Sequence, residues 1–480
     1  MNDRKGFGSN FGFLMAAVGS AVGLGNIWGF PNKMGANGGF PFLILYLALA
    51  LCCGVIIMLG ELALGRKTGH GAVGAYQSIS KRFKWLGWLG IAAAALIFSF
   101  YSALGGYCLR YVVVNFGNLL GAEFGTNGVG GADVFQGLLS QPDVSIAFAL
   151  AFMLITMLVV MCGVGGGIER VCSVGMPALF FILIICIIRS CTLPGAVDGL
   201  KYMFVPGWAV ANGIIDEAPG FWRVLTAAGG QMFFSLSLGA GVMITYGSYL
   251  DKKQDLGKST MIIVGMDTVV ALMAGLCVIP GRFALDPNGA LGGPELLFIT
   301  MQNVFDKMGP AGPVFGILFY LLVFFAAISS SISMLEVIVA HFCDKAREKG
   351  KGDRRKLYSA IVVVICAALC ALVCADGMGS NHISPAELLG LAGAKLPGWS
   401  TSWLGLFDSV AEGLLMPLGA LLMCLMISWE LKPDTLRQEI LLNGENRPWV
   451  YDFFRLCVKY ITPLCMLMIL YGQISDFFIV

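Results

Sequence analysis

An apolar segment near the N-terminus, residues 11–34, is interrupted in its middle by glycine and polar residues. Gly19, Gly23 and Gly25 fall within seven residues and are followed at once by Asn26. Glycine weakens a helix, and backbone groups left unpaired in lipid are costly unless they line a site enclosed by protein. The interruption therefore predicts a broken membrane helix with an ion or substrate site at the break. A small-residue face for helix packing is the alternative.

Apolar windows recur along the whole chain, which is 57% hydrophobic and only 12% charged. A helix needs about 20 apolar residues to cross a bilayer. Windows of that length lie near residues 11–34, 40–65, 87–120, 144–163, 168–191, 221–250, 259–283, 311–343, 357–375, 403–430 and 450–478. The sequence therefore predicts an all-α membrane protein with eleven transmembrane helices.

The sixth window carries a second interruption between Gln231 and Gly241, where hydroxyls and glycines replace the leucines of an ordinary span. Breaks in helices 1 and 6 indicate two inverted five-helix repeats, whose broken helices meet near the midplane in secondary transporters. We expect one transporter domain over residues 1–480, with repeats at 10–191 and 220–430 and an extra helix at 450–478. A coincidence of two packing faces is the alternative.

Other function classes find no support in the residues. The net charge of +2 does not suggest a nucleic-acid partner, and the 15 cysteines and three histidines have no metal-ligand spacing. We expect buried thiols rather than disulfides or a metal centre. A phosphate-binding GxxxxGK[ST] motif is absent from the sequence, so ATP-driven pumping within this chain is not expected. We predict that the chain is not an enzyme and that it uses no organic cofactor. The sequence does not indicate its oligomeric state.

Lysine and arginine gather in alternate loops, most densely between Lys345 and Lys356 after the eighth window. Cytoplasmic loops are enriched in these residues. With eleven crossings, the bias predicts a multi-pass protein of the cell membrane with a cytoplasmic N-terminus and an external C-terminus.

Several motifs together resemble the neurotransmitter:sodium symporter family, in particular its bacterial amino-acid transporter branch. They are the run from Gly19 to Trp28 followed by Phe30 and Pro31, the turn at residues 37–39, Gly60-Glu61 with Gly65-Arg66, and the block from Ser235 to Gly239. The resemblance extends over essentially the whole chain. It implies symport of sodium with an amino acid, and it assigns roles to individual positions.

The resemblance implies that the substrate carboxylate lies on the amides of Leu24 and Gly25 and on the hydroxyl of Tyr101. Taken alone, Tyr101 would more readily be interpreted as a packed aromatic residue. The substrate ammonium would face the carbonyls of Ala21, Phe234 and Ser235 and the hydroxyl of Ser237. Glycine at position 23, where monoamine carriers of the family have aspartate, favours substrates that bring their own carboxylate. The side-chain pocket would be walled by Ile97, Phe234, Ala240, Ser331 and Met334, and it would accept large hydrophobic side chains.

The resemblance also implies two sodium ions. Ligands of the first would be the carbonyls of Ala21 and Ser235, the side chains of Asn26 and Asp267, and the Ser235 hydroxyl. Asp267 stands where many relatives have asparagine, and a carboxylate inside a membrane span is functional by default. Ligands of the second would be the carbonyls of Gly19, Val22 and Ala326 and the hydroxyls of Ser329 and Ser330. These serines could instead bond back to their own helix.

Chloride independence follows from the same alignment. Tyr46, Gln231 and Ser235 match the anion site of chloride-dependent relatives, but Ala271 replaces its last serine. A fixed carboxylate at Asp267 would supply the negative charge that chloride otherwise brings.

The resemblance also extends to the family's gating positions, with one exception. Arg4, Ser248, Tyr249 and Asp344 resemble the family's intracellular latch, and Gly167 with Pro177 resembles the motif that unwinds helix 5. The usual external arginine is Gly29 here, whereas its acidic partner is matched by Asp408. Lys33, one turn beyond Gly29, could reach Asp408 or remain solvated at the membrane surface.

The sequence thus predicts sodium-coupled, chloride-independent symport of hydrophobic L-amino acids, aromatic ones included, by alternating access. A transporter-like sensor or an ion-conducting channel with the same fold and sodium site is the alternative.

Overall fold

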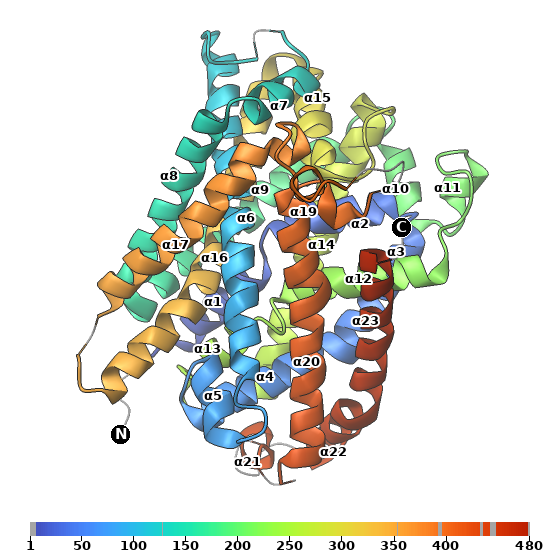
Figure 1. Cartoon of the computed structure of the whole chain (residues 1–480). Coiled ribbons are helices and arrows are strands. Elements are labelled where there is room, and N and C mark those ends of the chain that lie inside the picture. The colour runs from blue at the N-terminus through green and yellow to red at the C-terminus, as the bar shows by residue number, and fades with distance from the viewer. Residues whose placement is uncertain are drawn as a thin grey trace.

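The computed structural model describes residues 6–126, 128–352, 354–391, 396–432, 435–441 and 448–478, with side chains as far as Ser475. Long helices run between the two ends of the molecule (Figure 1). Within the described part of the chain, nine helical stretches are long and apolar enough to cross a membrane, and one bent pair adds a tenth.

The nine stretches coincide with windows expected from the sequence. They are Phe40–Thr68 (α3, Phe40–Leu49, and α4, Val55–Thr68), Leu86–Leu120 (α6), Pro142–Met161 (α8), Val164–Cys191 (a π-helical turn, then α9, Glu169–Cys191), Leu256–Leu285 (α14), Gly309–Glu348 (mostly α16, Gly312–Glu348), Arg355–Gly379 (mostly α17, Arg355–Asp376), Trp403–Glu430 (α19, Trp403–Asp408, and α20, Met416–Leu425, with π-helical turns) and Pro448–Ser475 (α22, Pro448–Leu456, and most of α23, Thr462–Phe478).

The first predicted break is present. Helix α1 (Asn10–Ala21) ends where Val22 turns extended, with a ψ of 94°, and a second helical stretch, Gly25–Ala36, begins three residues later at an angle of 44°. This stretch is a π-helical turn, Gly25–Gly29, followed by α2 (Phe30–Ala36). The backbone groups freed at the break therefore lie inside the protein, because this part of the chain is buried from Phe13 onward apart from a few partly exposed side chains.

The second predicted break divides the sixth window into α12 (Phe221–Leu236) and α13 (Val242–Gly247). Ser237 has a φ of +53°, and Gly239 and Gly241 have φ values of +78° and +74°. The left-handed region is unfavourable for serine. A hydrogen bond from its hydroxyl to the Ser20 carbonyl, 3.0 Å long, helps to hold Ser237 there and joins the two breaks. Since neither half is long enough to cross a bilayer alone, the sixth crossing is this broken pair. The expected all-α fold with broken helices 1 and 6 is thereby confirmed.

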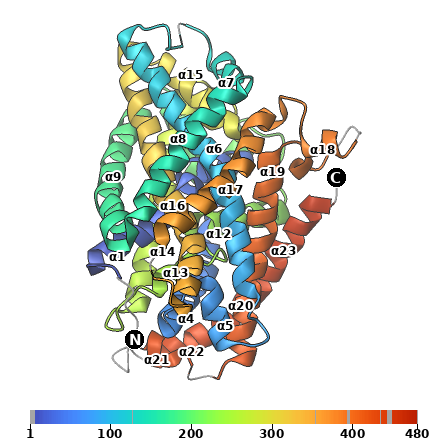
Figure 2. The same ribbon diagram turned by 60° about the vertical axis from the view of Figure 1, so that its left-hand side comes forward.

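Shorter helices cap the two ends of the molecule (Figures 1 and 2). One end carries α5 (Ala72–Ile79), α21 (Arg437–Ile440) and α22, and the opposite end carries α7 (Gly131–Leu139) and α15 (Met301–Asp306). The remaining short helices are α10 (Ala196–Phe204), α11 (Trp208–Ala211) and α18 (Pro385–Leu388). In the interior, α1 packs against α9, α14 and α16, and α6 lies along α16. Both breaks are therefore enclosed by long helices.

Candidate substrate and ion sites

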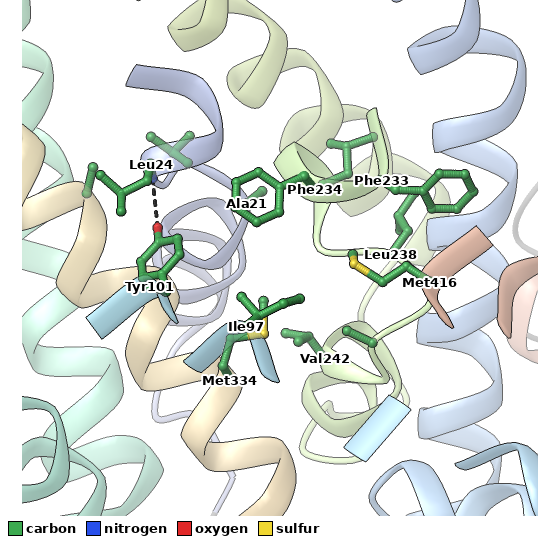
Figure 3. Close-up of a cluster of buried hydrophobic side chains, with 14 of the residues drawn as sticks. Ala21, Leu24, Ile97, Tyr101, Phe233, Phe234, Leu238, Val242, Met334 and Met416 are labelled. Atoms are coloured by element: carbon green, nitrogen blue, oxygen red, sulfur yellow. Dashed lines mark hydrogen bonds between the residues drawn. The ribbon is translucent and has the colours of Figure 1, made fainter. Parts of the chain in front are cut away.

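Side chains from three helices meet around the two breaks (Figure 3). Ile97 and Tyr101 come from α6, Phe234 from α12 and Met334 from α16, and all four are buried. The Tyr101 hydroxyl accepts a hydrogen bond from the Leu24 amide at 2.7 Å, and the ring centroids of Tyr101 and Phe234 are 6.3 Å apart. The structure thus gathers the residues predicted for the substrate carboxylate and for the apolar pocket.

Two glycines at the first break are required by close approach. A Cβ atom on Gly23 would lie 2.2 Å from the Ser330 hydroxyl oxygen and 2.5 Å from that of Tyr101. A Cβ atom on Gly25 would lie 3.0 Å from the Phe234 ring. Any larger residue at position 23 would displace the tyrosine that meets the Leu24 amide.

Two predicted pocket residues have partners outside this cluster. The Ser331 hydroxyl is 3.1 Å from that of Thr156 on α8. Ala240 is fully buried in the second break, and its backbone approaches Gly90 of α6, where an added Cβ would lie 3.1 Å from the Ala240 carbonyl carbon. Their contact with substrate remains a prediction.

A carboxylate lies beside the first break. The side chain of Asp267 on α14 is fully buried and accepts hydrogen bonds from Asn26 (2.8 Å), the Ser235 hydroxyl (2.9 Å) and the Tyr46 hydroxyl (3.1 Å). The Asn26 amide oxygen accepts from the Gly23 backbone amide at 3.2 Å. Three donors compensate the carboxylate for its removal from water. We call Asn26, Tyr46, Ser235 and Asp267 the Asp267 cluster. It contains the side chains predicted for the first sodium ion, and the buried Ala21 lies at the same break.

Two serines of α16 meet the backbone of α1 just before its break. The Ser330 hydroxyl donates to the Ser20 carbonyl at 3.0 Å and also reaches the Gly19 carbonyl at 3.3 Å. The Ser329 hydroxyl reaches the Val22 carbonyl at 3.5 Å but bonds more closely, at 3.0 Å, to Ala326 of its own helix. The back-bonding alternative thus applies to Ser329 and not to Ser330. We call this group the serine bridge: Gly19, Ser20, Val22, Ala326, Ser329 and Ser330.

The serine bridge contains every position predicted for the second sodium ion. Its hydroxyl hydrogens face carbonyl oxygens, and a hydroxyl can rotate to offer a lone pair instead. Hard cations take such oxygen ligands. The donor set therefore fits a monovalent cation chemically, although the ion itself remains a prediction.

We call the end of the molecule that carries α5, α21 and α22 the inner end, and the opposite end the outer end, after the orientation expected from the sequence. At the inner end, only part of the predicted latch can be described, because Arg4 lies outside the described residues. The Tyr249 hydroxyl donates to the carboxylate of Glu336 at 2.7 Å, and Arg355 binds the same fully buried carboxylate at 2.5 Å. Asp344 accepts from the Gly71 amide at 3.3 Å, and the Ser248 hydroxyl bonds to the Thr245 carbonyl. Glu336 thus joins the inner ends of α13, α16 and α17.

A cavity of about 840 Å³ opens at the same end, lined by Gly6, Gly8, the stretch 161–166, Glu169, Tyr249, Ala340, Cys343, Asp344, Arg347 and Arg355. The stretch just before the predicted helix-5 motif of Gly167 and Pro177 borders it. Gly163 has a φ of +81°, and a π-helical turn, Val164–Ile168, contains Gly167. Pro177 lies inside α9, where it removes one backbone hydrogen bond. The start of the fifth span, residues 163–168 before α9, is thus irregular beside the cavity. Its unwinding remains a prediction.

At the outer end, the structure differs from the predicted pairing. Lys33 forms an ion pair with Glu412, not with Asp408, which lies one turn earlier on the same helix. All three side chains line a cavity of about 290 Å³ together with Arg223 and Gln473. Lys33 thus pairs with the more buried of the two carboxylates, since Glu412 is buried and Asp408 is partly exposed.

Sequence reasoning missed three residues that connect these regions. The Ser20 carbonyl accepts from both Ser237 and Ser330. The buried carboxylate of Glu61 accepts from the Gly239 amide at 2.7 Å and so holds the second break. Glu336 organises the inner end. A single carboxylate within an apolar window was the available signal for Glu61 and Glu336, whereas a backbone carbonyl leaves no signal in the sequence.

Comparisons with known proteins agree with this architecture. A profile of the sodium:neurotransmitter symporter family matches residues 4–127 and 132–478. An uncharacterized sodium-dependent transporter of Bacillus subtilis, YhdH, is 36% identical over 479 residues, 97% of each chain. Another, from Methanocaldococcus jannaschii, is 30% identical and aligns with 91% of this chain and 84% of its own length. The crystal structure of MhsT in complex with L-phenylalanine superposes with a TM-score of 0.83, at 34% identity over 98% of this chain and 100% of that one.

The broken helices and these matches define a membrane transport protein, not an enzyme. The chain belongs to the sodium:neurotransmitter symporter family, as its motifs predicted. It is a sodium-dependent transporter.

Proposed function

We propose that this transporter couples sodium to the uptake of hydrophobic L-amino acids, aromatic ones included, by alternating access and without chloride. The observation that carries the proposal is the meeting of the Asp267 cluster with the Tyr101–Leu24 hydrogen bond at one helix break. An amino-acid carboxylate placed there would face a backbone amide and a phenol on one side and the first cation on the other.

Three further facts support the hydrophobic substrate class. Gly23 leaves no room for a fixed carboxylate in place of the substrate's own. The surrounding side chains of Ile97, Phe234 and Met334 are apolar, and methionine adapts to varied shapes. A structural neighbour, MhsT, binds L-phenylalanine. Ala240, at a position that is phenylalanine in a bacterial relative, would leave space for an aromatic side chain.

Two sodium ions, at the Asp267 cluster and the serine bridge, would complete the transport cycle. The inner cavity beside helix 5 would release the second ion first, and the Tyr249–Glu336–Arg355 contacts would close that path. We propose a cytoplasmic N-terminus and an external C-terminus in the cell membrane, supported by the arginine- and lysine-rich loop after α16. We also propose that residues 10–191 and 220–430 form the two inverted repeats that move against each other during transport.

Uptake of labelled phenylalanine into proteoliposomes tests the function. An inward sodium gradient should drive accumulation, with equal rates in chloride and gluconate. Competition should rank leucine, methionine, phenylalanine or tryptophan above glycine, and Ala240→Phe should exclude the largest first. Sodium currents without substrate accumulation would favour a channel. Tight amino-acid binding without any flux would favour a sensor.

A further inference from the structure

A hollow of about 660 Å³ lies at the end of the molecule that carries α5 and α22. It lies between the loop after α5 and the last turn of the span Trp403–Glu430, the tenth of the eleven expected from the sequence. Its lining residues are Lys81, Arg82, Phe83, Leu425, Trp429 and Glu430. Ser80, at the start of the loop, bonds to the Glu430 carboxylate and fixes the loop against the tenth span.

Positive charge predominates around the hollow. Lys81 and Arg82 are exposed on its rim. Lys459 packs over the ring of Trp429, and the Lys459 Nζ atom lies 5.1 Å from the ring centroid. The one carboxylate in the lining, Glu430, is already hydrogen-bonded to Ser80. Three cationic side chains against one engaged carboxylate favour an anionic occupant.

The surroundings of the hollow are those of a membrane boundary. Trp85, Trp429 and Tyr460 are exposed around it, and such aromatic rings prefer the headgroup level of a bilayer. Beyond Tyr460, the exposed side chains of Ile461, Leu464, Leu467 and Tyr471 follow one face of the last helix. A ligand held here would therefore meet cations at one end and an apolar helix face at the other.

We infer that the hollow binds the phosphate headgroup of an anionic phospholipid. Lys81, Arg82 and Lys459 would contact the phosphate, Trp429 would pack against the glycerol region, and the acyl chains would lie along the exposed face of α23. A free phosphate ion would use only the first of these contacts, so the apolar face favours the lipid.

The test measures the association of spin-labelled phosphatidylglycerol and spin-labelled phosphatidylcholine with the full-length protein by electron paramagnetic resonance. Each cation near a membrane surface contributes about 1 kcal/mol toward an anionic lipid. We expect a preference for phosphatidylglycerol that falls by about thirtyfold in Lys81→Gln/Arg82→Gln, as two such contributions imply. Lys459→Gln should lower the preference by about fivefold.

The matched control is Lys252→Gln/Lys253→Gln, which removes two exposed cations from the loop between α13 and α14. It should keep the preference, and sodium-driven uptake in phosphatidylcholine vesicles should show that every variant is folded. Equal loss in both double variants would mean a diffuse surface effect and would overturn the proposal. Complete competition by soluble glycerophosphate would assign the hollow to a free anion instead.

Discussion

The Asp267 cluster and the serine bridge lie on either side of the same helix break, yet they are built differently. The Asp267 cluster surrounds one buried carboxylate with three hydrogen-bond donors, whereas the serine bridge consists of hydroxyls and backbone carbonyls. A full charge attracts a cation more strongly than a neutral hydroxyl or carbonyl dipole does. In the protein interior this attraction is also less weakened than in water. The comparison suggests a charged region that substitutes for an anion and a neutral region from which a cation leaves readily.

The largest expected effect is at the charged region. Asp267→Asn keeps the shape of the side chain but removes its charge, and a unit charge about 4 Å from a cation contributes up to about 4 kcal/mol near a protein surface. We expect sodium-driven uptake in gluconate to fall by about a hundredfold, within that upper bound, with partial recovery in chloride. Uptake assays in the two anions provide the measurement. Strong chloride stimulation of the unmodified protein would remove the contrast between the two regions.

The inner end contains a second buried carboxylate, which tests whether charge generally dominates in this protein. Arg355→Gln would leave Glu336 without its cation, and breaking a buried pair costs about 3 kcal/mol or more. Thermal unfolding should show a clear loss of stability. Glu336→Gln added to this variant should restore most of it, because the amide can still accept from Tyr249. A double variant as unstable as Arg355→Gln would refute this explanation.

Smaller effects are expected where single neutral ligands are lost. Asn26→Ala removes a proposed ligand together with a donor to Asp267, and Ser330→Ala removes one hydroxyl of the serine bridge. Losses of about 1 kcal/mol per neutral hydrogen-bonding group predict a rise of about fivefold in half-saturating sodium for Ser330→Ala and more for Asn26→Ala. Sodium titrations of uptake provide the measurement. Ser428→Ala is the control, because it removes a hydroxyl that donates to the carbonyls of Cys424 and Val458 and belongs to neither proposed ion site. An unchanged sodium curve for Asn26→Ala would exclude it as a ligand.

The smallest effect is expected at the outer end, where the charged group of Lys33 is closer to solvent than the carboxylates of Asp267 and Glu336 are. The Lys33 side chain is 24% exposed, so its pair with Glu412 should contribute no more than about 1 kcal/mol. Transport kinetics of Lys33→Ala, Glu412→Ala and the double variant should show coupling, because the two side chains are in contact. Lys33→Ala and Asp408→Ala should combine more nearly additively. The reverse pattern would restore Asp408 as the partner of Lys33.

Much of the architecture could be predicted from the sequence alone, because a bilayer demands long apolar helices with paired backbones. The apolar windows and both interruptions correspond to helices and breaks at nearly the same residues. The family resemblance also named the residues that meet in the Asp267 cluster and, apart from Ser20, those of the serine bridge. Conversely, the partner of Lys33 could not be chosen, because a flexible stem reaches either of two carboxylates one turn apart.

By itself, the sequence determined the kind of protein, the places where its helices break and the residue types that gather at the breaks. These features depend on local composition, such as glycines and hydroxyls within an apolar window. Only the tertiary structure decided which oxygen faces which donor. The Ser20 carbonyl became the link between the two breaks, and Glu336 became the centre of the inner end. Such contacts join residues far apart in the chain, and helix packing rather than local sequence brings them within hydrogen-bonding distance.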